Sequence, residues 1–214
     1  MRTRTPQTFL FTFVYPPIPT EGIVFRREGV CLGAVLTNPD EIRRAAERME
    51  AEYLDFRRYL KAHHCPLEPL HEIAAEVESQ IDCTACANCC RHGSVTVTEA
   101  DIAAIAEYLG TTREEVIRLY TVPDPAAPHP RLLASTKQGC TFLDGTLCLV
   151  YEARPRACRE FPYASHRERS LGGRMERLCA WAALCPIVFN ALELYKERVG
   201  YRRRPASAGG QACE

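Results

Sequence analysis

The stretch DCTACANCCRHG, residues 82–93, decides how this chain folds, because it places Cys83, Cys86, Cys89 and Cys90 within eight residues. Thiolates spaced this closely along a chain rarely have any common use other than binding metal. Cys89 and Cys90 are adjacent, so their side chains point in different directions, which suits two metal centres better than one disulfide. We therefore expect the fold to be organised around this segment.

The remaining cysteines indicate a framework rather than scattered thiols. The chain has 12 cysteines in 214 residues, and nine of them lie between positions 83 and 185. Cys31, Cys65 and Cys213 stand apart. Disulfides are the alternative, but they need an oxidising compartment. The N-terminal run FLFTFV is short and leads into prolines without a signal-peptide cleavage site. We therefore predict a cytoplasmic, metal-binding protein.

Composition excludes some partners. The 27 basic and 27 acidic residues balance, so no global field would attract nucleic acid or an anionic membrane. No stretch approaches the ~18 apolar residues of a membrane span. We expect an unidentified protein or redox partner, and neither nucleic acid nor a membrane.

Residues 1–37 show little periodicity and are predicted to be an extended lead-in. Asn38 and Pro39 then provide a helix start. Apolar residues follow at helical spacing, which predicts one long helix; they are Ile42, Ala46, Met49, Tyr53, Phe56 and Leu60. A second helix is expected from about Pro69 to Gln80. Together they form a helical hairpin over residues 38–81.

Residues 82–200 are predicted to form a cysteine-cluster core. Thr98 and Asp101 provide a capping box, and Gly110 can end that helix. Residues 121–131 contain four prolines and are expected to be a loop. Asp144-Gly145 predicts a tight hairpin that places Cys140 opposite Cys148. The tail over residues 202–214 has a disordered composition.

The fold class that follows is α+β and mainly helical. It consists of a small cysteine-rich, metal-stapled domain with one short β-hairpin, preceded by the long N-terminal helical hairpin. Both parts belong to a single domain over residues 38–201.

Several joined motifs resemble the YkgJ-type cysteine-cluster family of zinc- or iron-chelating proteins. The motifs are C-x-x-C-x-x-C-C, Asp101-Ile102, Cys140-x-Phe-Leu, Cys148, Tyr151, Arg154-Pro155, Cys158-Arg159 and Phe161-Pro162. The resemblance implies metal binding through the cysteines, which we take to be Cys83, Cys86, Cys89, Cys90, Cys140, Cys148, Cys158 and Cys185. In the related flagellin lysine N-methylases, similar cysteines are associated with an iron–sulfur cluster. The chain has no convincing glycine-rich loop for S-adenosylmethionine, so transfer of the methylase activity is not expected.

The spacing favours iron–sulfur over zinc. C-x-x-C-x-x-C can hold three corners of a 4Fe-4S cubane, and Cys185-Pro186 resembles the distal Cys-Pro that completes such sites. Cys90, Cys140, Cys148 and Cys158 could then form a second site. Structural zinc prefers two C-x-x-C knuckles, and only one is present here, yet thiolate ligation suits both metals. Whether Cys179 is a ligand or a buried thiol stays open.

Arginines accompany the cysteines. Arg91, Arg154, Arg156 and Arg159 can offset the negative charge of a thiolate cluster and raise its potential. We single out Arg154 and Arg159 as contacts of the cofactor. The alternative is that some of these arginines simply pair with Glu152 and Glu160.

The functional prediction is a metal-cluster protein for electron transfer, redox sensing or assembly of a partner. Hydrolase triads, phosphate loops and the His-Glu-x-x-His pattern are missing from the sequence. Two alternatives stay open: a protein- or peptide-modifying enzyme related to the methylases, and a zinc-stapled interaction module. No catalytic residue can be named.

Overall fold

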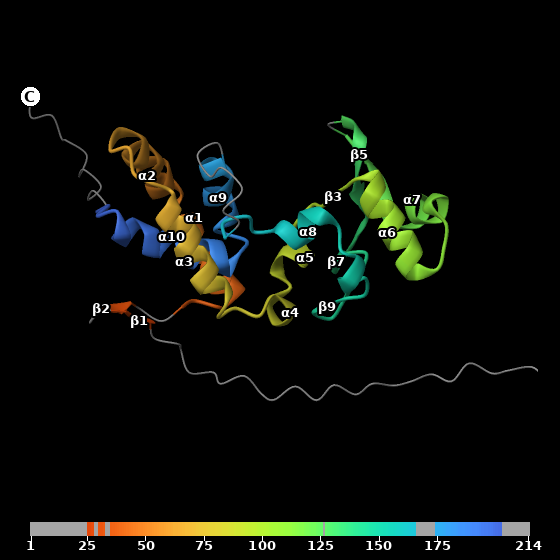
Figure 1. Cartoon of the computed structure of the whole chain (residues 1–214), viewed down its shortest axis with the longest axis horizontal. Helices are drawn as coiled ribbons and strands as arrows, with labels where there is room; N and C mark the ends of the chain where they lie inside the picture. Colours follow the sequence, from red (N-terminus) through yellow and green to blue (C-terminus); the bar gives the residue numbers. More distant parts are fainter. Residues whose placement is uncertain (1–24, 28–29, 33–34, 126, 166–173, 203–214) are drawn as a thin grey trace, which may run out of the picture. The chain divides into compact units, whose positions relative to one another are not determined.

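The computed structural model describes residues 25–27, 30–32, 35–125, 127–165 and 174–202 (Figure 1). The chain divides into two compact units, Met1–Ala34 and Val35–Glu214. In the first unit, β1 (Phe25–Arg27) pairs with β2 (Val30–Leu32) in antiparallel fashion. The rest of the predicted lead-in up to residue 34, and the tail beyond residue 202, lie outside the described residues. The following description concerns the second unit.

The described part of the second unit is mainly helical, with short antiparallel strands, which agrees with the predicted α+β class. Its helices are α1 (Pro39–Arg48), α2 (Glu50–Ala62), α3 (Glu68–Glu78), α4 (Cys83–Cys86), α5 (Asn88–His92), α6 (Glu99–Leu109), α7 (Arg113–Tyr120), the 3-10 helix η1 (Tyr151–Ala153), α8 (Arg156–Glu160), α9 (Met175–Trp181) and α10 (Pro186–Arg198). Its strands are β3 (Thr96–Val97), β4 (Thr121–Asp124), β5 (Ala127–Leu133), β6 (Ser135–Thr136), β7 (Gly139–Cys140), β8 (Leu143–Asp144) and β9 (Leu147–Cys148).

The helix start at Asn38 is confirmed, since its side-chain oxygen accepts from the Asp40 backbone N–H at 2.9 Å. The single long helix is wrong, however, because the chain breaks between α1 and α2 at Met49. The Met49 N–H bonds to the Ala46 carbonyl three residues back, which tightens the last turn of α1. Apart from half-buried Met49, the predicted apolar stripe is buried, with Ile42 and Phe56 fully enclosed.

Helix α10 is the central element of the helical part and packs against α3, α1 and α9. Lys196 on α10 is buried and bonds to Glu52 and Glu193, each at 2.8 Å. The Tyr195 hydroxyl donates to the Pro66 carbonyl at 2.6 Å. The contacts with Glu52 of α2 and with Pro66 hold α10 against the preceding part of the chain, and Cys185 is its N-cap residue.

A second core lies under α6 and α7. The predicted capping box is present, with Thr98 and Asp101 bonded reciprocally, and Gly110 ends α6 in the left-handed conformation. The core consists of Val97, Ile102, Ile105, Ala106, Val116, Leu133, Phe142, Val150 and Ala153. Cys140 and Cys148 pack against it, so this core supports the cysteines that follow in the chain.

The loop predicted over residues 121–131 is wrong, because β4 and β5 pair there in a three-stranded sheet of order β3-β5-β4. The prolines are accommodated by position. Pro123 lies where the β4–β5 register shifts, between Val122 and Asp124. Pro128 and Pro130 precede Arg131 and Leu132, the two β5 residues that pair with β3. A missing N–H is tolerated where a strand has a neighbour on one side only.

The predicted hairpin forms, but its register differs. Asp144 pairs with Leu147, and Leu143 pairs with Cys148, so the turn residues are Gly145 and Thr146. Cys140 belongs to a different strand pair, in which it faces Ser135. Gly145 has a φ of +61°, and this left-handed conformation fixes where the turn falls.

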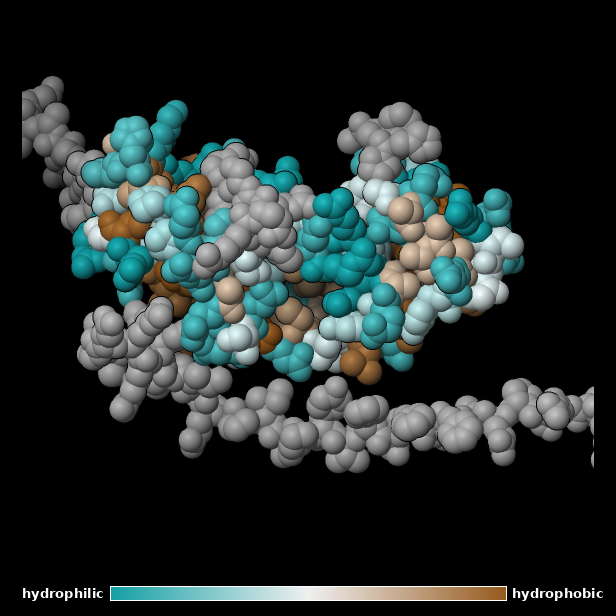
Figure 2. Space-filling model, viewed as in Figure 1, coloured by the Kyte–Doolittle hydropathy of each residue, from teal (hydrophilic) through white to brown (hydrophobic). Residues whose placement is uncertain are grey.

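Among the described residues, no single helix combines the length and the apolar character needed to cross a membrane, and α9 with α10 meets that test only as a pair bent by 119°. Exposed polar side chains cover α8, where Figure 2 shows a hydrophilic surface.

Candidate metal centre

The cysteine loop consists of two short helices joined by one left-handed residue. Asp82 caps α4 by accepting from the Thr84 backbone N–H at 2.8 Å. Ala87 follows α4 with a φ of +47° and is 3% exposed. A left-handed residue stops α4 and redirects the chain into α5. Cys83 and Cys86 therefore lie on one helix, while Cys89 and Cys90 lie on the next.

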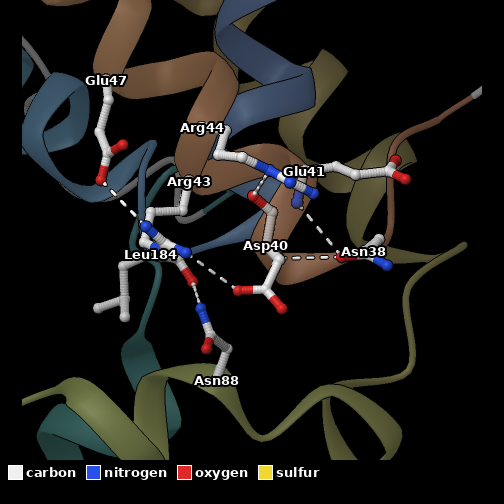
Figure 3. A network of polar contacts seen from close by, with 8 residues as sticks. All are labelled: Asn38, Asp40, Glu41, Arg43, Arg44, Glu47, Asn88 and Leu184. Carbon is white, nitrogen blue, oxygen red and sulfur yellow. Dashed lines mark hydrogen bonds and ion pairs between the residues drawn. The ribbon is translucent and has the colours of Figure 1, made fainter.

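Cys83, Cys86, Cys89 and Cys185 line one pocket, and we call these residues the first group. The other residues of the pocket wall are apolar, and they include Ile81, Phe161, Pro162 and Leu184. The side-chain amide of Asn88 donates to the Leu184 carbonyl at 2.8 Å (Figure 3). This hydrogen bond ties α5 to the residue before Cys185, which comes from a distant part of the chain.

Cys90, Cys140, Cys148 and Cys158 form a second group. The Cys158 thiol interacts electrostatically with all three of the others, and Cys140 interacts with Cys90 and Cys148. The four come from α5, β7, β9 and α8. Cys140 and Cys148 therefore lie within electrostatic range of each other, but the prediction that the hairpin places them opposite one another is wrong.

Burial opposes ionisation of most of these thiols. It raises the pKa of Cys158 and of Cys185 to about 12. Cys83 is an exposed residue, but its thiol faces the pocket, and partial burial raises its pKa to about 11. A metal would have to displace these protons, because the thiolate is the ligand.

Cys89 and Cys90 connect the two groups. A hydrogen bond between their thiols lowers the pKa of Cys90 to about 7, and Arg154 and Arg91 favour the Cys90 thiolate as well. The same hydrogen bond, together with burial, raises the pKa of Cys89. The negative charge of the pair therefore forms first on Cys90, on the side of the arginines.

The predicted cofactor arginines occupy different positions. Arg154 interacts electrostatically with Cys83 of the first group and with Cys90, Cys148 and Cys158 of the second. Its guanidinium lies 3.5 Å from the ring centroid of Tyr151. Arg159 donates a hydrogen bond to the Arg154 carbonyl.

The other two arginines beside the cysteines also have protein partners. Arg156 pairs with Glu160 at 2.6 Å, which matches the alternative considered for these arginines. Arg91 donates to the Gly145 carbonyl at 2.8 Å and so connects α5 with the β8–β9 turn.

Two residues that support the second group were not predicted to do so. Gly139 has a φ of +119°, and a Cβ atom there would lie 2.5 Å from the Cys90 carbonyl oxygen. Only glycine allows β7 to approach α5 this closely. Asp101, identified above only as a helix cap, also accepts from the Arg156 backbone N–H at 2.8 Å. That hydrogen bond anchors the start of α8. For these two supporting residues, the one local signal in the sequence was that a glycine, Gly139, directly precedes Cys140.

Cys179 lies apart from both groups. The charged groups that act on its thiol are Arg57, Lys196 and Glu193, and burial raises its pKa to about 11. Its surroundings are those of a buried thiol in the helical part.

The donor set fits a soft metal, since both groups consist of cysteine sulfur. Across the described ranges, no three or more His, Cys, Asp or Glu side chains already converge as a single-ion site. The first group instead surrounds a pocket.

Comparison with known proteins identifies one family. Residues 82–180 match the family CxxCxxCC, described as "Putative zinc- or iron-chelating domain". This match confirms the resemblance predicted from the cysteine spacing. It contains seven of the eight cysteines of the two groups and ends before Cys185. No curated protein and no solved structure matches the chain.

Proposed function

We propose, from the premise that residues 82–180 carry a domain of the zinc- or iron-chelating CxxCxxCC family, that this protein holds two iron–sulfur clusters and transfers electrons. Cys83, Cys86, Cys89 and Cys185 would hold one cluster, and Cys90, Cys140, Cys148 and Cys158 the other. Bound clusters would supply reversible one-electron chemistry, and the surrounding chain would set its potential.

The observation that carries the proposal is the division of eight cysteines into two groups of four. A 4Fe-4S cubane takes four cysteine ligands, and each group offers that number. The two groups do not follow the order of the cysteines along the chain, because adjacent Cys89 and Cys90 belong to different groups. The four thiols of the first group also line one apolar pocket, so all four could reach one bound cluster.

The electrostatics support the same assignment. A cubane with four thiolates carries net negative charge, and Arg154 faces cysteines of both groups. Nearby positive charge stabilises the more anionic, reduced state. Cys89 and Cys90 are adjacent in the chain, so ligands of the two centres would be neighbours and electrons could pass between the clusters.

Elemental analysis with spectroscopy of anaerobically purified protein tests the proposal. We expect about eight iron and eight sulfide per chain, since each cubane contains four of each. We also expect visible absorption that bleaches on reduction. A colourless protein containing stoichiometric zinc would contradict the proposal and favour a structural zinc module.

Electron paramagnetic resonance tests the presence of two adjacent clusters. The fully reduced protein should show magnetic interaction between the centres, because their ligands are neighbours. Cys185→Ser should remove that interaction and leave the signal of one cluster. If the wild-type protein showed a single unsplit signal and contained iron for one cluster only, the proposal of two clusters would be contradicted.

A further inference from the structure

Three aromatic rings connect the pocket of the first group with helix α9. Phe161 lines the pocket together with the cysteines. Its ring centroid lies 5.2 Å from that of Trp181, in an edge-on arrangement. Trp181 in turn stacks on Tyr163 at 5.5 Å. These separations are those of rings in direct contact, so the contacts are continuous from the pocket wall outward.

The outer end of this aromatic cluster carries positive charge. The Arg174 guanidinium lies 5.6 Å from the Tyr163 ring centroid, and that of Arg177 lies 5.8 Å from the Trp181 ring centroid. Arg177 is exposed and Arg174 is half-buried. The acidic residue between them, Glu176, pairs with Arg57 at 3.0 Å, so within the part of the chain that the structure describes the two arginines set the charge at this end.

We propose that Phe161, Trp181 and Tyr163 conduct single electrons between the centre of the first group and an anionic one-electron acceptor that approaches at Arg174 and Arg177. The inference rests on the proposed function. In the step, the reduced cluster loses one electron and the acceptor gains it. No bond forms or breaks and no proton has to move, because the rings act as a contact bridge. Conjugated rings in contact couple donor and acceptor better than saturated side chains across the same gap.

Stopped-flow oxidation of the reduced, cluster-loaded protein tests the bridge. The probes are ferricyanide, which is anionic, and hexaamminecobalt(III), which is cationic. Trp181→Leu should slow oxidation by ferricyanide several-fold, whereas Trp181→Phe, which keeps a ring, should stay close to wild type. Tyr108→Leu, which removes an exposed aromatic ring on α6, is the matched control and should have no effect. Equal rates for the two Trp181 variants and wild type would refute the bridge.

The same experiment tests the arginines. Arg174→Gln with Arg177→Gln should lower the ferricyanide rate by about tenfold at low salt, because steering toward the rings is lost. The hexaamminecobalt(III) rate should not fall. An equal loss with both probes would refute the docking position. If the purified protein were colourless and contained zinc, both the proposed function and the bridge would be refuted. If it contained iron but Trp181→Leu left the oxidation rate unchanged, only the bridge would be refuted.

Fluorescence provides a second measurement that needs no variant of Trp181. Trp181 is the only tryptophan of the chain, so its emission reports on the neighbouring pocket. Loading the iron–sulfur clusters should quench that emission several-fold relative to the metal-free protein. Cys185→Ser, which disables the first group, should restore most of it, while Cys158→Ser should restore little. If the emission of the cluster-loaded wild-type protein were not quenched, Trp181 would not be close enough to the cluster of the first group, and the bridge would be refuted.

Discussion

Cys89 and Cys90 are consecutive residues that serve different groups of thiols. Cys89 faces the pocket that also contains Cys185, while Cys90 interacts with Cys140 and Cys158. The proposed ligand sets therefore separate at a single peptide bond. A substitution at either position should have a distinguishable effect.

Single serine substitutions should remove one centre each. We expect Cys89→Ser and Cys185→Ser to lose the same half of the bound metal, and Cys90→Ser and Cys158→Ser to lose the other half. Metal analysis with electron paramagnetic resonance of each variant measures this. Cys179→Ser is the matched control and should keep both centres, because Cys179 lies among Arg57, Lys196 and Glu193. If Cys89→Ser and Cys185→Ser differed in which centre they lose, the assignment would be wrong.

Arg154 should influence the reduction potential more than its neighbours do. Arg154→Glu should keep the iron and lower the potential of both centres, because added negative charge disfavours the more anionic reduced state. Arg156→Glu should have a smaller effect, since Arg156 is exposed and pairs with Glu160. Voltammetry of the loaded proteins measures both shifts. Equal shifts for the two variants would show that Arg154 has no special position.

At this scale the sequence allowed the candidate cysteines to be named, but not the residues that support them. The cysteines could be named because their spacing is itself the signal. The need for glycine at position 139 could not be predicted. It comes from the Cys90 carbonyl oxygen, which is distant in the sequence but would lie only 2.5 Å from a Cβ atom at residue 139. The second hydrogen bond of Asp101, to the Arg156 N–H, arises in the same way.

Among the elements, the contact between β7 and α5 should be the most sensitive. Gly139→Ala should reduce loading of the second group and destabilise the protein, because the new methyl group would collide with the backbone of Cys90 and Arg91. The φ of +119° adds strain of order 1–3 kcal/mol. Urea unfolding and metal analysis measure these effects.

The control for Gly139 is Gly110→Ala. Gly110 also has a positive φ, but no atom lies within 4 Å of the position that a Cβ would occupy there. This variant should cost about 1–2 kcal/mol, because its backbone stays left-handed, and should keep both centres. Similar metal loss in the two variants would mean that backbone strain alone, rather than the collision, is responsible.

The anchor of α8 provides another prediction. Both carboxylate oxygens of Asp101 are acceptors: Oδ1 accepts from the Arg156 N–H and Oδ2 from the Thr98 N–H. In Asp101→Asn, one of these oxygens is replaced by an NH₂ group. One buried acceptor is lost, so the variant should be less stable by ~1–3 kcal/mol and should lose metal from the second group. Glu115→Gln, at the equivalent but exposed position of α7, should do neither. If a destabilised Asp101→Asn protein kept its full metal content, the anchor of α8 would not be needed for metal binding by the second group.

Local signals predicted the elements well, and long-range pairing did not follow from them. Asn38, Thr98 and Gly110 cap helices as expected, because a cap depends on a few neighbouring residues. The β4–β5 pairing was missed because four prolines suggest a loop. Nothing local indicates that three of them fall at a register shift or on a one-sided part of β5, while Pro125 lies in the turn after β4. The hairpin register was missed because Gly145 could occupy either turn position.

For the whole molecule, metal should protect against alkaline unfolding. Burial raises the pKa of Cys158 and Cys185 from 9.0 to about 12, so the folded metal-free state holds their protons more tightly than the unfolded state. Their contribution to stability is present below about pH 9 and is lost as the pH rises toward about 12. The urea midpoint of metal-free, reduced protein should therefore fall over that range.

The loaded protein should not show this fall, because bound thiolates carry no proton to lose. In metal-free Cys158→Ala Cys185→Ala protein, the decline should be smaller than in metal-free wild type. An identical decline in this double variant would assign the pH dependence to other groups.

The position of Cys185 also affects how the cysteine-rich region can be cut out of the chain. The family match ends at residue 180, yet the fourth thiol of the first group is the N-cap of α10. A fragment that follows the family boundary would contain every thiol of one centre and three of the other. It would also lack the helix that packs on α3. A recombinant fragment meant to carry both centres must therefore extend past Cys185.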